Sequence, residues 1–344
     1  MKPLILPSNR PPERFYRGGA RISAFRGEVR QASREPEDWV GSVTTVNGDP
    51  VLGLTHLSDG RLLRDAIASN PGAWLGDEHV RRWGDDSRLL VKLLDAGQRL
   101  PVHAHPHDEF AATHLGRAHG KAEAWYILQG GTVHLGLIRD VMADELGDLV
   151  ERQDVDTLLG LLHAVDVAPG DVVWVPPGEL HAIGEGILLL ELQQPEDLSI
   201  LLEWQDFAID GADLGHLGLG FDLALTAVNR SARSVEDIRA LVGTAPASGS
   251  VFPAAADQYF RLERLPVDGV VELPPGFAVV VVSEGEVSTG GETWPSGTTA
   301  LVPAGAREVS LSGRGEVLVA RPPAPPEAGS APGRMPESSH APRD

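Results

Sequence analysis

Two histidines one residue apart are the most informative side chains in the sequence. His103 and His105 lie in the segment GQRLPVHAHP, residues 97–106. In an extended segment, residues i and i+2 project from the same face, so both imidazoles converge on one point, as metal ligands must. The pair alone is modest evidence, because two histidines on an exposed strand give the same pattern.

A carboxylate and a third histidine complete a candidate ligand set. Glu123 comes 18 residues after His105, at the head of an apolar run, where an unpaired carboxylate has to face water or a partner. His181 follows a strand-like run and a Pro-Pro-Gly turn, and a turn at a strand end is where a barrel presents side chains to its mouth. The chain has no cysteine, so a metal has to be held by histidines and carboxylates.

The joint spacing of these residues matches the two cupin motifs. The first is Gly, five residues, His-x-His, then Glu, six residues, Gly; the second is Gly, five residues, Pro-x-Gly, two residues, His. The gap between His105 and Glu123 is longer than in the compact form of the motif. By this resemblance the protein is expected to be mainly β, with a cupin jelly-roll β-sandwich that holds a metal through His103, His105, Glu123 and His181.

More specifically, the chain resembles the type I mannose-6-phosphate isomerases (phosphomannose isomerases). The resemblance covers roughly residues 17–194 and rests on the segments LVKLLD (90–95), VHAHP (102–106), GKAEAWYI (120–127), VPPGELHAIG (175–184) and ELQQ (191–194). It implies a zinc-dependent isomerase that interconverts mannose 6-phosphate and fructose 6-phosphate through an enediolate. The implied partner is a small-molecule sugar phosphate and the implied cofactor is one divalent zinc ion.

Two lysines are candidates for contact with the substrate. Lys121 matches the catalytic or substrate-contacting lysine of the family, and in an extended segment it shares a face with Glu123. Lys92 is expected to bind substrate. The alternatives are an ordinary exposed lysine at 121 and a lysine at 92 whose stem lies along apolar neighbours at a strand edge.

The chain departs from the family pattern at two positions. His103 stands where the family usually has Gln, and it still supplies a ligand atom. Leu201 stands where the family carries a catalytic Arg. An enediolate and a phosphate need positive charge, so another cation is expected to replace this Arg, with Arg17, Arg139 and Arg230 as candidates, unless the substrate is uncharged.

Many short β-branched runs separated by the 39 glycines and 27 prolines are typical of β-sandwiches and barrels. Strands are expected at 89–94, 124–128, 133–138, 171–175 and 187–193, and again at 278–282, 299–302 and 317–320. Gly-rich turns are expected at 284–285 and 290–291. Apolar residues near helical spacing predict a helical insert at about 141–164, and 235–242 reads as a short helix.

These elements predict a division of the chain into four parts. Residues 1–200 form the metal-binding cupin catalytic domain, and 201–250 form a helical connection and linker. Residues 251–320 form a second, degenerate cupin-like β domain, because a Pro-x-Gly echo at 303–305 is followed by Glu308 where the motif has His. Residues 321–344 form a tail too poor in apolar residues to fold.

Charge and composition exclude several other classes of protein. A formal charge of −20 opposes binding to nucleic acid through a broad surface, and no apolar run is long enough to span a membrane. The short apolar run at the N-terminus does not read as a secretory signal, so we expect a cytoplasmic enzyme. The sugar, the metal in cells and the oligomeric state stay open.

Two alternatives to the isomerase are consistent with the same residues. Three His and one Glu also suit iron, so a metal-dependent cupin of oxygenase-like chemistry is one alternative. A non-catalytic sugar-binding cupin is the other, and Leu201 favours it.

Overall fold

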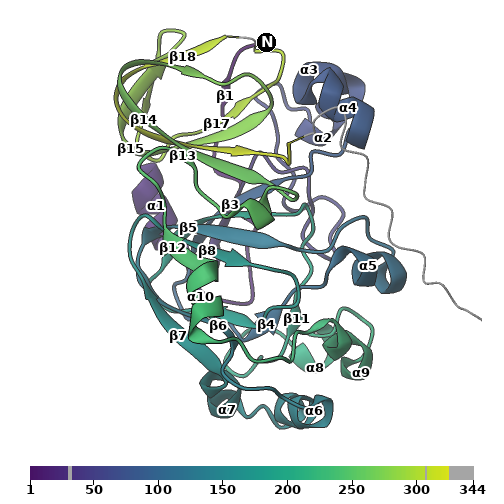
Figure 1. Ribbon diagram of the computed structural model, residues 1–344. Helices are drawn as coiled ribbons and strands as arrows, with labels where there is room; N and C mark the ends of the chain where they lie inside the picture. The colour runs from purple at the N-terminus through teal and green to yellow at the C-terminus, as the bar shows by residue number, and fades with distance from the viewer. Residues whose placement is uncertain (30–32, 307, 325–344) are drawn as a thin grey trace, which may run out of the picture.

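The computed structural model describes residues 1–29, 33–306 and 308–324 (Figure 1). The strands in these ranges form three antiparallel sheets. In spatial order, the six-stranded sheet contains β12 (Val242–Thr244), β8 (Asp171–Val175), β5 (Glu123–Gln129), β10 (Leu188–Gln193), β3 (Leu90–Asp95) and β2 (Glu37–Val40). The five-stranded sheet contains β11 (Ile200–Leu201), β4 (His103–Ala104), β9 (His181–Ile183), β6 (Gly131–Leu137) and β7 (Leu162–Val167).

The six-stranded and five-stranded sheets pack face to face. Trp125 and Ile127 of β5 share one buried cluster with Leu135 of β6 and Ile183 of β9. Two antiparallel sheets that bury a common core are a β-sandwich, so the predicted mainly β, cupin jelly-roll fold is confirmed.

The alternation of side chains along the strands selects the polar residues that face the interior of this sandwich. Glu123 shares a face with Trp125 and Ile127, whereas Ala124 and Tyr126 belong to the cluster on the opposite side of the sheet. By the same alternation Lys92 shares its face with Leu94, and Glu191 shares its face with Leu189. Three charged side chains therefore enter the interior of the sandwich from neighbouring strands.

A third sheet covers the outer face of the six-stranded sheet, at the top of Figure 1. It consists of β1 (Leu4–Ile5), β17 (Thr299–Val302), β15 (Ala278–Thr289), β18 (Val309–Arg321), β14 (Arg261–Leu273) and β13 (Gly249–Ser250), and β16 (Glu292–Pro295) pairs with β15. Val280 and Val319 face the core of this sheet itself, whereas Val279 and Leu318 pack with Leu190 against the sandwich.

The helices lie outside these sheets, and those of residues 143–160 and 221–227 pack on the outer face of the five-stranded sheet, at the lower end of Figure 1. They are α1 (Ala20–Arg26), α2 (Leu63–Ser69), α3 (Pro71–Leu75), α4 (Asp77–Trp83), α5 (Asp108–Phe110) with the π-helical turn η1 (Ala111–Leu115), α6 (Ala143–Arg152), α7 (Val155–Gly160), α8 (Gly211–Leu214), α9 (Phe221–Ala224), η2 (Leu225–Ala227), α10 (Val235–Leu241) and η3 (Ala254–Ala256). None of the helices in the described ranges is long and apolar enough to cross a membrane.

Several predicted boundaries differ from the structure. The helical insert ends earlier than predicted, because β7 begins at Leu162 and pairs with β6. The apolar residues at 158, 159 and 162 have the spacing of one face of a helix, but residue 162 lies on a strand. The expected turn at 284–285 is also wrong, because β15 continues through it with a bulge. Gly285 is required there by close strand contact, since a Cβ would lie 2.4 Å from the Arg314 carbonyl oxygen.

The two ends of the chain also differ from the predicted division. Strand β1 pairs with β17 of the third sheet, whereas the prediction places residues 1–200 in the first domain. Two residues carry no readable period, so the sequence pattern does not reveal this strand. Arg321, the predicted start of the tail, is the last residue of β18, and the rest of the predicted tail from 325 onward lies outside the described residues.

Candidate metal centre and active site

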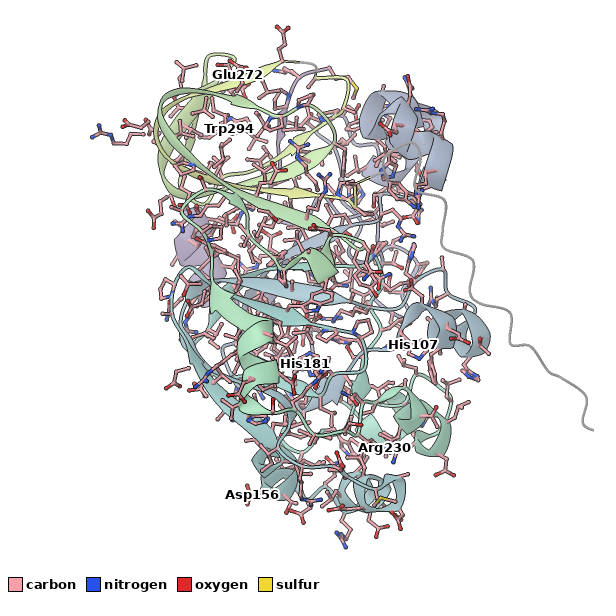
Figure 2. All side chains as sticks on the ribbon, in the orientation of Figure 1. His107, Asp156, His181, Arg230, Glu272 and Trp294 are labelled. Atoms are coloured by element: carbon pink, nitrogen blue, oxygen red, sulfur yellow. The ribbon has the colours of Figure 1, made fainter. Side chains whose placement is uncertain are left out.

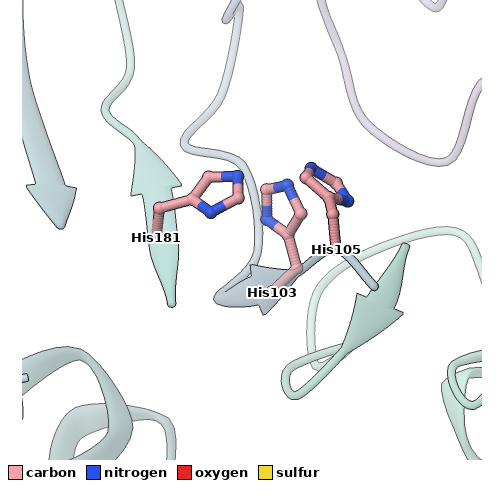
Figure 3. A group of neighbouring side chains, drawn as sticks. All are labelled: His103, His105 and His181. Atoms are coloured by element: carbon pink, nitrogen blue, oxygen red, sulfur yellow. The ribbon is translucent and has the colours of Figure 1, made fainter. Parts of the chain in front are cut away.

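Three imidazoles meet inside the sandwich, on the β4–β9 strand pair of the five-stranded sheet. His103 of β4 and His181 of β9 are register partners on neighbouring strands, and His105 follows β4 directly. One ring nitrogen from each lies within 4.8 Å of the others, and all three side chains are buried (Figure 3). The predicted face shared by His103 and His105 therefore also receives His181.

Backbone carbonyls fix the tautomer of each ring. The Nδ1 atoms of His103, His105 and His181 donate to the carbonyl oxygens of Pro101 (2.8 Å), Leu198 (2.7 Å) and Glu179 (2.9 Å). Each Nδ1 therefore carries the proton, and each Nε2 presents a lone pair to the common centre. Such outer hydrogen bonds are what orient metal-binding histidines.

Glu123 completes the group from the opposite sheet. Its Oε2 lies 3.0 Å from His105 Nε2 and its Oε1 lies 3.1 Å from His181 Nε2. His181 Nε2 is a buried atom without a hydrogen-bond partner among the described residues, and Glu123 Oε2 has the Lys121 ammonium at 3.0 Å but accepts no hydrogen bond there. Imidazole and carboxylate acceptors that face one another at about 3 Å in a buried site repel each other unless a cation lies between them. The donor set therefore fits a divalent metal ion.

The electrostatics of the group favour the ligand form of each side chain. Burial opposes ionisation of Glu123, but the Lys121 ammonium and the His105 ring hold the pKa of its carboxyl well below the usual range. Burial and the neighbouring rings lower the pKa of His103 well below its usual value, and burial and Lys121 lower the pKa of His105 to about 4. At neutral pH the carboxylate is therefore ionised and these two imidazoles are neutral.

Lys121 contacts this group directly. Its Nζ lies 3.0 Å from Glu123 Oε2 and donates to His105 Nε2 at 3.1 Å. The segment that carries Lys121 and Glu123 is held by Gln194, whose Oε1 accepts a hydrogen bond from the Ala122 amide at 2.9 Å. An ammonium at this position can donate a proton or a hydrogen bond to a substrate oxygen beside the metal.

A small cavity of about 40 Å³ adjoins the group and is lined by His103, Lys121 and Glu123. This volume holds a few water molecules, so a sugar has to displace them and shift side chains on entry. Lys92, predicted to bind substrate, lines the cavity, but its Nζ lies between Glu37 (3.5 Å) and Glu191 (3.4 Å). A larger cavity of about 590 Å³ lies between α6 and α9 and contains none of these groups.

Glu191 is a cavity residue that the sequence reading did not single out. It lines the cavity, and its Oε1 accepts no hydrogen bond from a described residue. Burial and the negative charge of Glu123 raise its pKa. A buried carboxyl with a raised pKa beside a reactive centre has the properties of a general base. Glu191 lies in the ELQQ segment that resembles the family, but the sequence gives no sign that its carboxyl faces the cavity.

Arg14 is the second residue that sequence reasoning missed. It lines the same cavity as Leu201, whereas Arg17, Arg139 and Arg230 are absent from its lining. Arg139 pairs with Glu145 at the surface, and Arg230 lies beside the lower helices, at the larger cavity (Figure 2). No motif surrounds Arg14, and only the tertiary fold brings residues 14 and 201 to one cavity.

Comparisons with known proteins agree with this geometry. No family model matches the chain. Mannose-6-phosphate isomerase ManA of Bacillus subtilis is 33% identical over 248 residues, which cover 69% of this chain and 75% of that protein. Mannose-6-phosphate isomerase of Streptococcus mutans is 36% identical over 127 residues, covering 35% of this chain and 39% of that protein.

Solved structures extend the similarity to the whole fold. The crystal structure of mannose 6-phosphate isomerase from Bacillus subtilis superposes with a TM-score of 0.70 at 22% identity, over 93% of this chain and 100% of the other. A mutant of phosphomannose isomerase from Salmonella typhimurium gives a TM-score of 0.73 at 15% identity, over 94% and 100%. The fold is thus shared along nearly the full length, and the identity to ManA makes the relationship one of sequence as well. The chain belongs to the mannose-6-phosphate isomerase family.

Proposed function

We propose that this protein is a zinc-dependent aldose–ketose isomerase that interconverts mannose 6-phosphate and fructose 6-phosphate. The observation that carries the proposal is the convergence of three buried imidazole nitrogens, with the Glu123 carboxylate 3.0 and 3.1 Å from two of the rings and Lys121 in contact with it. The names of the sequence relatives supply the substrate.

The reaction moves a proton between C1 and C2 of the open-chain sugar through an enediolate. When bound by His103, His105, Glu123 and His181, a zinc ion supplies a Lewis acid for the negative charge that develops on the sugar oxygens. The Lys121 ammonium lies 3.0 Å from the Glu123 carboxylate. It is therefore close enough to the metal ligands to donate hydrogen bonds to the same sugar oxygens.

Glu191 is the group that we assign to proton transfer at carbon. Its raised pKa and its Oε1, which accepts no hydrogen bond from a described residue, make it able to take a proton from C2 and return it to C1. Lys92 lies 3.4 Å from Glu191 and stabilises the ionised form of this carboxyl before the proton is taken. The buried walls of the sandwich exclude bulk water, which limits loss of the transferred proton to solvent.

A coupled assay tests the proposal. Purified protein is incubated with mannose 6-phosphate, and fructose 6-phosphate is detected with and without a chelator, alongside elemental analysis. The proposal requires turnover that the chelator abolishes and that added zinc restores. No turnover by protein that contains a full equivalent of zinc rejects it.

A second function has one specific observation in its favour. Three imidazoles and one carboxylate also suit iron. The elemental analysis separates the two, because iron rather than zinc in protein that lacks isomerase activity indicates oxygenase-like chemistry.

A further inference from the structure

Arg14 lines the cavity with a side chain that is 11% exposed. Its backbone is anchored by Arg34, whose carbonyl oxygen accepts from the Arg14 amide (3.1 Å) and whose Nε donates to the Arg14 carbonyl oxygen (2.9 Å). The guanidinium carbon lies 6.0 Å from the centre of the Trp39 ring. Arg14 is therefore held in place by its backbone and by an aromatic ring.

The guanidinium keeps unused donors. Its Nε donates to Glu37 at 3.4 Å and its Nη2 donates to Asp197 at 3.5 Å, both long contacts. No described residue accepts a hydrogen bond from Nη1. Arg99, in contrast, donates to both carboxylate oxygens of Glu203. An arginine whose donors are only partly used is able to take up a further anion.

The other cations of the cavity are already committed. Lys121 contacts Glu123 and His105 in the candidate metal group, and Lys92 lies between two glutamates. Three cations and four carboxylates line the cavity, so a phosphate dianion entering it needs a cation with free donors as well as the metal. Leu201, on the same cavity, offers no donor.

The location of Arg14 indicates which part of the substrate it meets. Its polar partners are Glu37 and Asp197, and it forms no hydrogen bond or ion pair with the three histidines, Glu123 or Lys121. In a hexose 6-phosphate, the phosphate lies at the opposite end of the chain from the C1 and C2 atoms that react at the metal. We propose that Arg14 binds the phosphate group of the substrate. This inference rests on the proposed function.

Binding of mannitol 6-phosphate tests this inference in the absence of turnover, because this compound has the phosphate but no carbonyl group to isomerise. Isothermal titration calorimetry on the purified full chain compares wild type, Arg14→Gln and Arg139→Gln. Loss of a charge-assisted contact is expected to weaken binding by Arg14→Gln about tenfold to hundredfold. Arg139→Gln is the matched control, since its surface ion pair lies away from the cavity, and it is expected to bind as wild type does.

Kinetics separate binding from a structural role. Arg14→Gln is expected to raise KM for mannose 6-phosphate by a similar factor while kcat and zinc content stay near wild type. A fall in kcat and zinc content with unchanged affinity for mannitol 6-phosphate overturns the inference. If Arg14→Gln does not fold, Arg14→Lys keeps the charge beside Glu37 and Asp197 but loses the planar fork; severalfold weaker binding supports the inference and unchanged binding overturns it.

The outcome also distinguishes this inference from the proposed function. Wild-type protein that neither binds mannitol 6-phosphate nor isomerises mannose 6-phosphate contradicts the proposed function. Wild-type protein that does both, with Arg14→Gln binding equally well, contradicts only the role of Arg14.

Discussion

His103 and His181 face each other across two antiparallel strands, with ring centres 4.0 Å apart. They are 78 residues apart in the sequence, and the pairing of β4 with β9 brings them together. Hydrogen bonds from both Nδ1 atoms to backbone carbonyls leave both Nε2 atoms free to face the common centre of the three rings. The site is thus built from strand pairing and ring tautomers together.

Removing one of these rings is expected to remove the metal. His181→Ala deletes a lone pair at the common centre, so zinc affinity is expected to fall by more than the roughly 10- to 100-fold that loss of an outer-shell contact costs. Activity is expected to fall in parallel. Zinc content after dialysis measures this, and His114→Ala, at an exposed position on η1, is the control that retains metal.

Lys121→Met is expected to separate catalysis from metal binding. The substitution keeps the buried stem and removes the ammonium beside Glu123, so kcat is expected to fall about 10²- to 10⁴-fold while zinc content is unchanged. Steady-state kinetics with mannose 6-phosphate and elemental analysis give both numbers. The matched control is Lys2→Met, at a side chain that is 78% exposed. Unchanged turnover in Lys121→Met removes Lys121 from the reaction.

Glu191→Gln tests the assignment of the carbon base. The amide has the shape of the carboxyl but cannot take the proton, so kcat is expected to fall by at least about 100-fold. Exchange of the C2 proton of mannose 6-phosphate with deuterated solvent, followed by NMR, is expected to cease as well. Glu185→Gln, at an exposed turn, serves as control. Proton exchange at the wild-type rate in Glu191→Gln would assign the base elsewhere.

A contact between the sandwich and the third sheet is expected to show in alkaline stability. Tyr126 of β5 donates to Glu316 of β18 at 3.4 Å, and burial together with the Glu316 charge raises the tyrosine pKa from 10.0 to about 12. The folded protein thus favours the neutral phenol. Its contribution is complete below pH 10 and is lost as the pH rises from 10 to about 12.

Chemical denaturation across this range measures the effect. Wild type is expected to lose roughly 2 kcal/mol more than Tyr126→Phe between pH 10 and 12, because each pKa unit corresponds to about 1.4 kcal/mol and the loss is incomplete at the folded-state pKa. Below pH 10 the difference between the two proteins is expected to be constant. Parallel loss in both proteins above pH 10 would contradict the raised pKa.

The sequence predicts the parts of the fold whose patterns are local. The runs at 171–175 and 299–302 coincide with β8 and β17, because buried strands bounded by turn residues leave a readable signal. Leu162 misleads, since a short apolar run fits a helix and a strand equally well. Gly285 misleads because close strand packing and a turn both require glycine.

The candidate site is also predictable only in part from the sequence. The shared face of His103 and His105 follows from strand geometry, and the cupin motifs link them to Glu123 and His181 across long gaps. The cation at Arg14 and the carboxylate of Glu191 at the cavity depend on which distant segments the fold brings together and on which hydrogen bonds each side chain makes. Neither property is encoded by local pattern, so only the three-dimensional structure reveals them.

Zinc titration of metal-free protein tests the central claim most directly. The chain is stripped with chelator, zinc is added in fractions of an equivalent, and the rate of fructose 6-phosphate formation is followed at saturating mannose 6-phosphate. If His103, His105, Glu123 and His181 hold one catalytic ion, the rate rises linearly and levels off at one equivalent per chain. A rate that is unaffected by stripping, or that stays at zero after a full equivalent has bound, would contradict it.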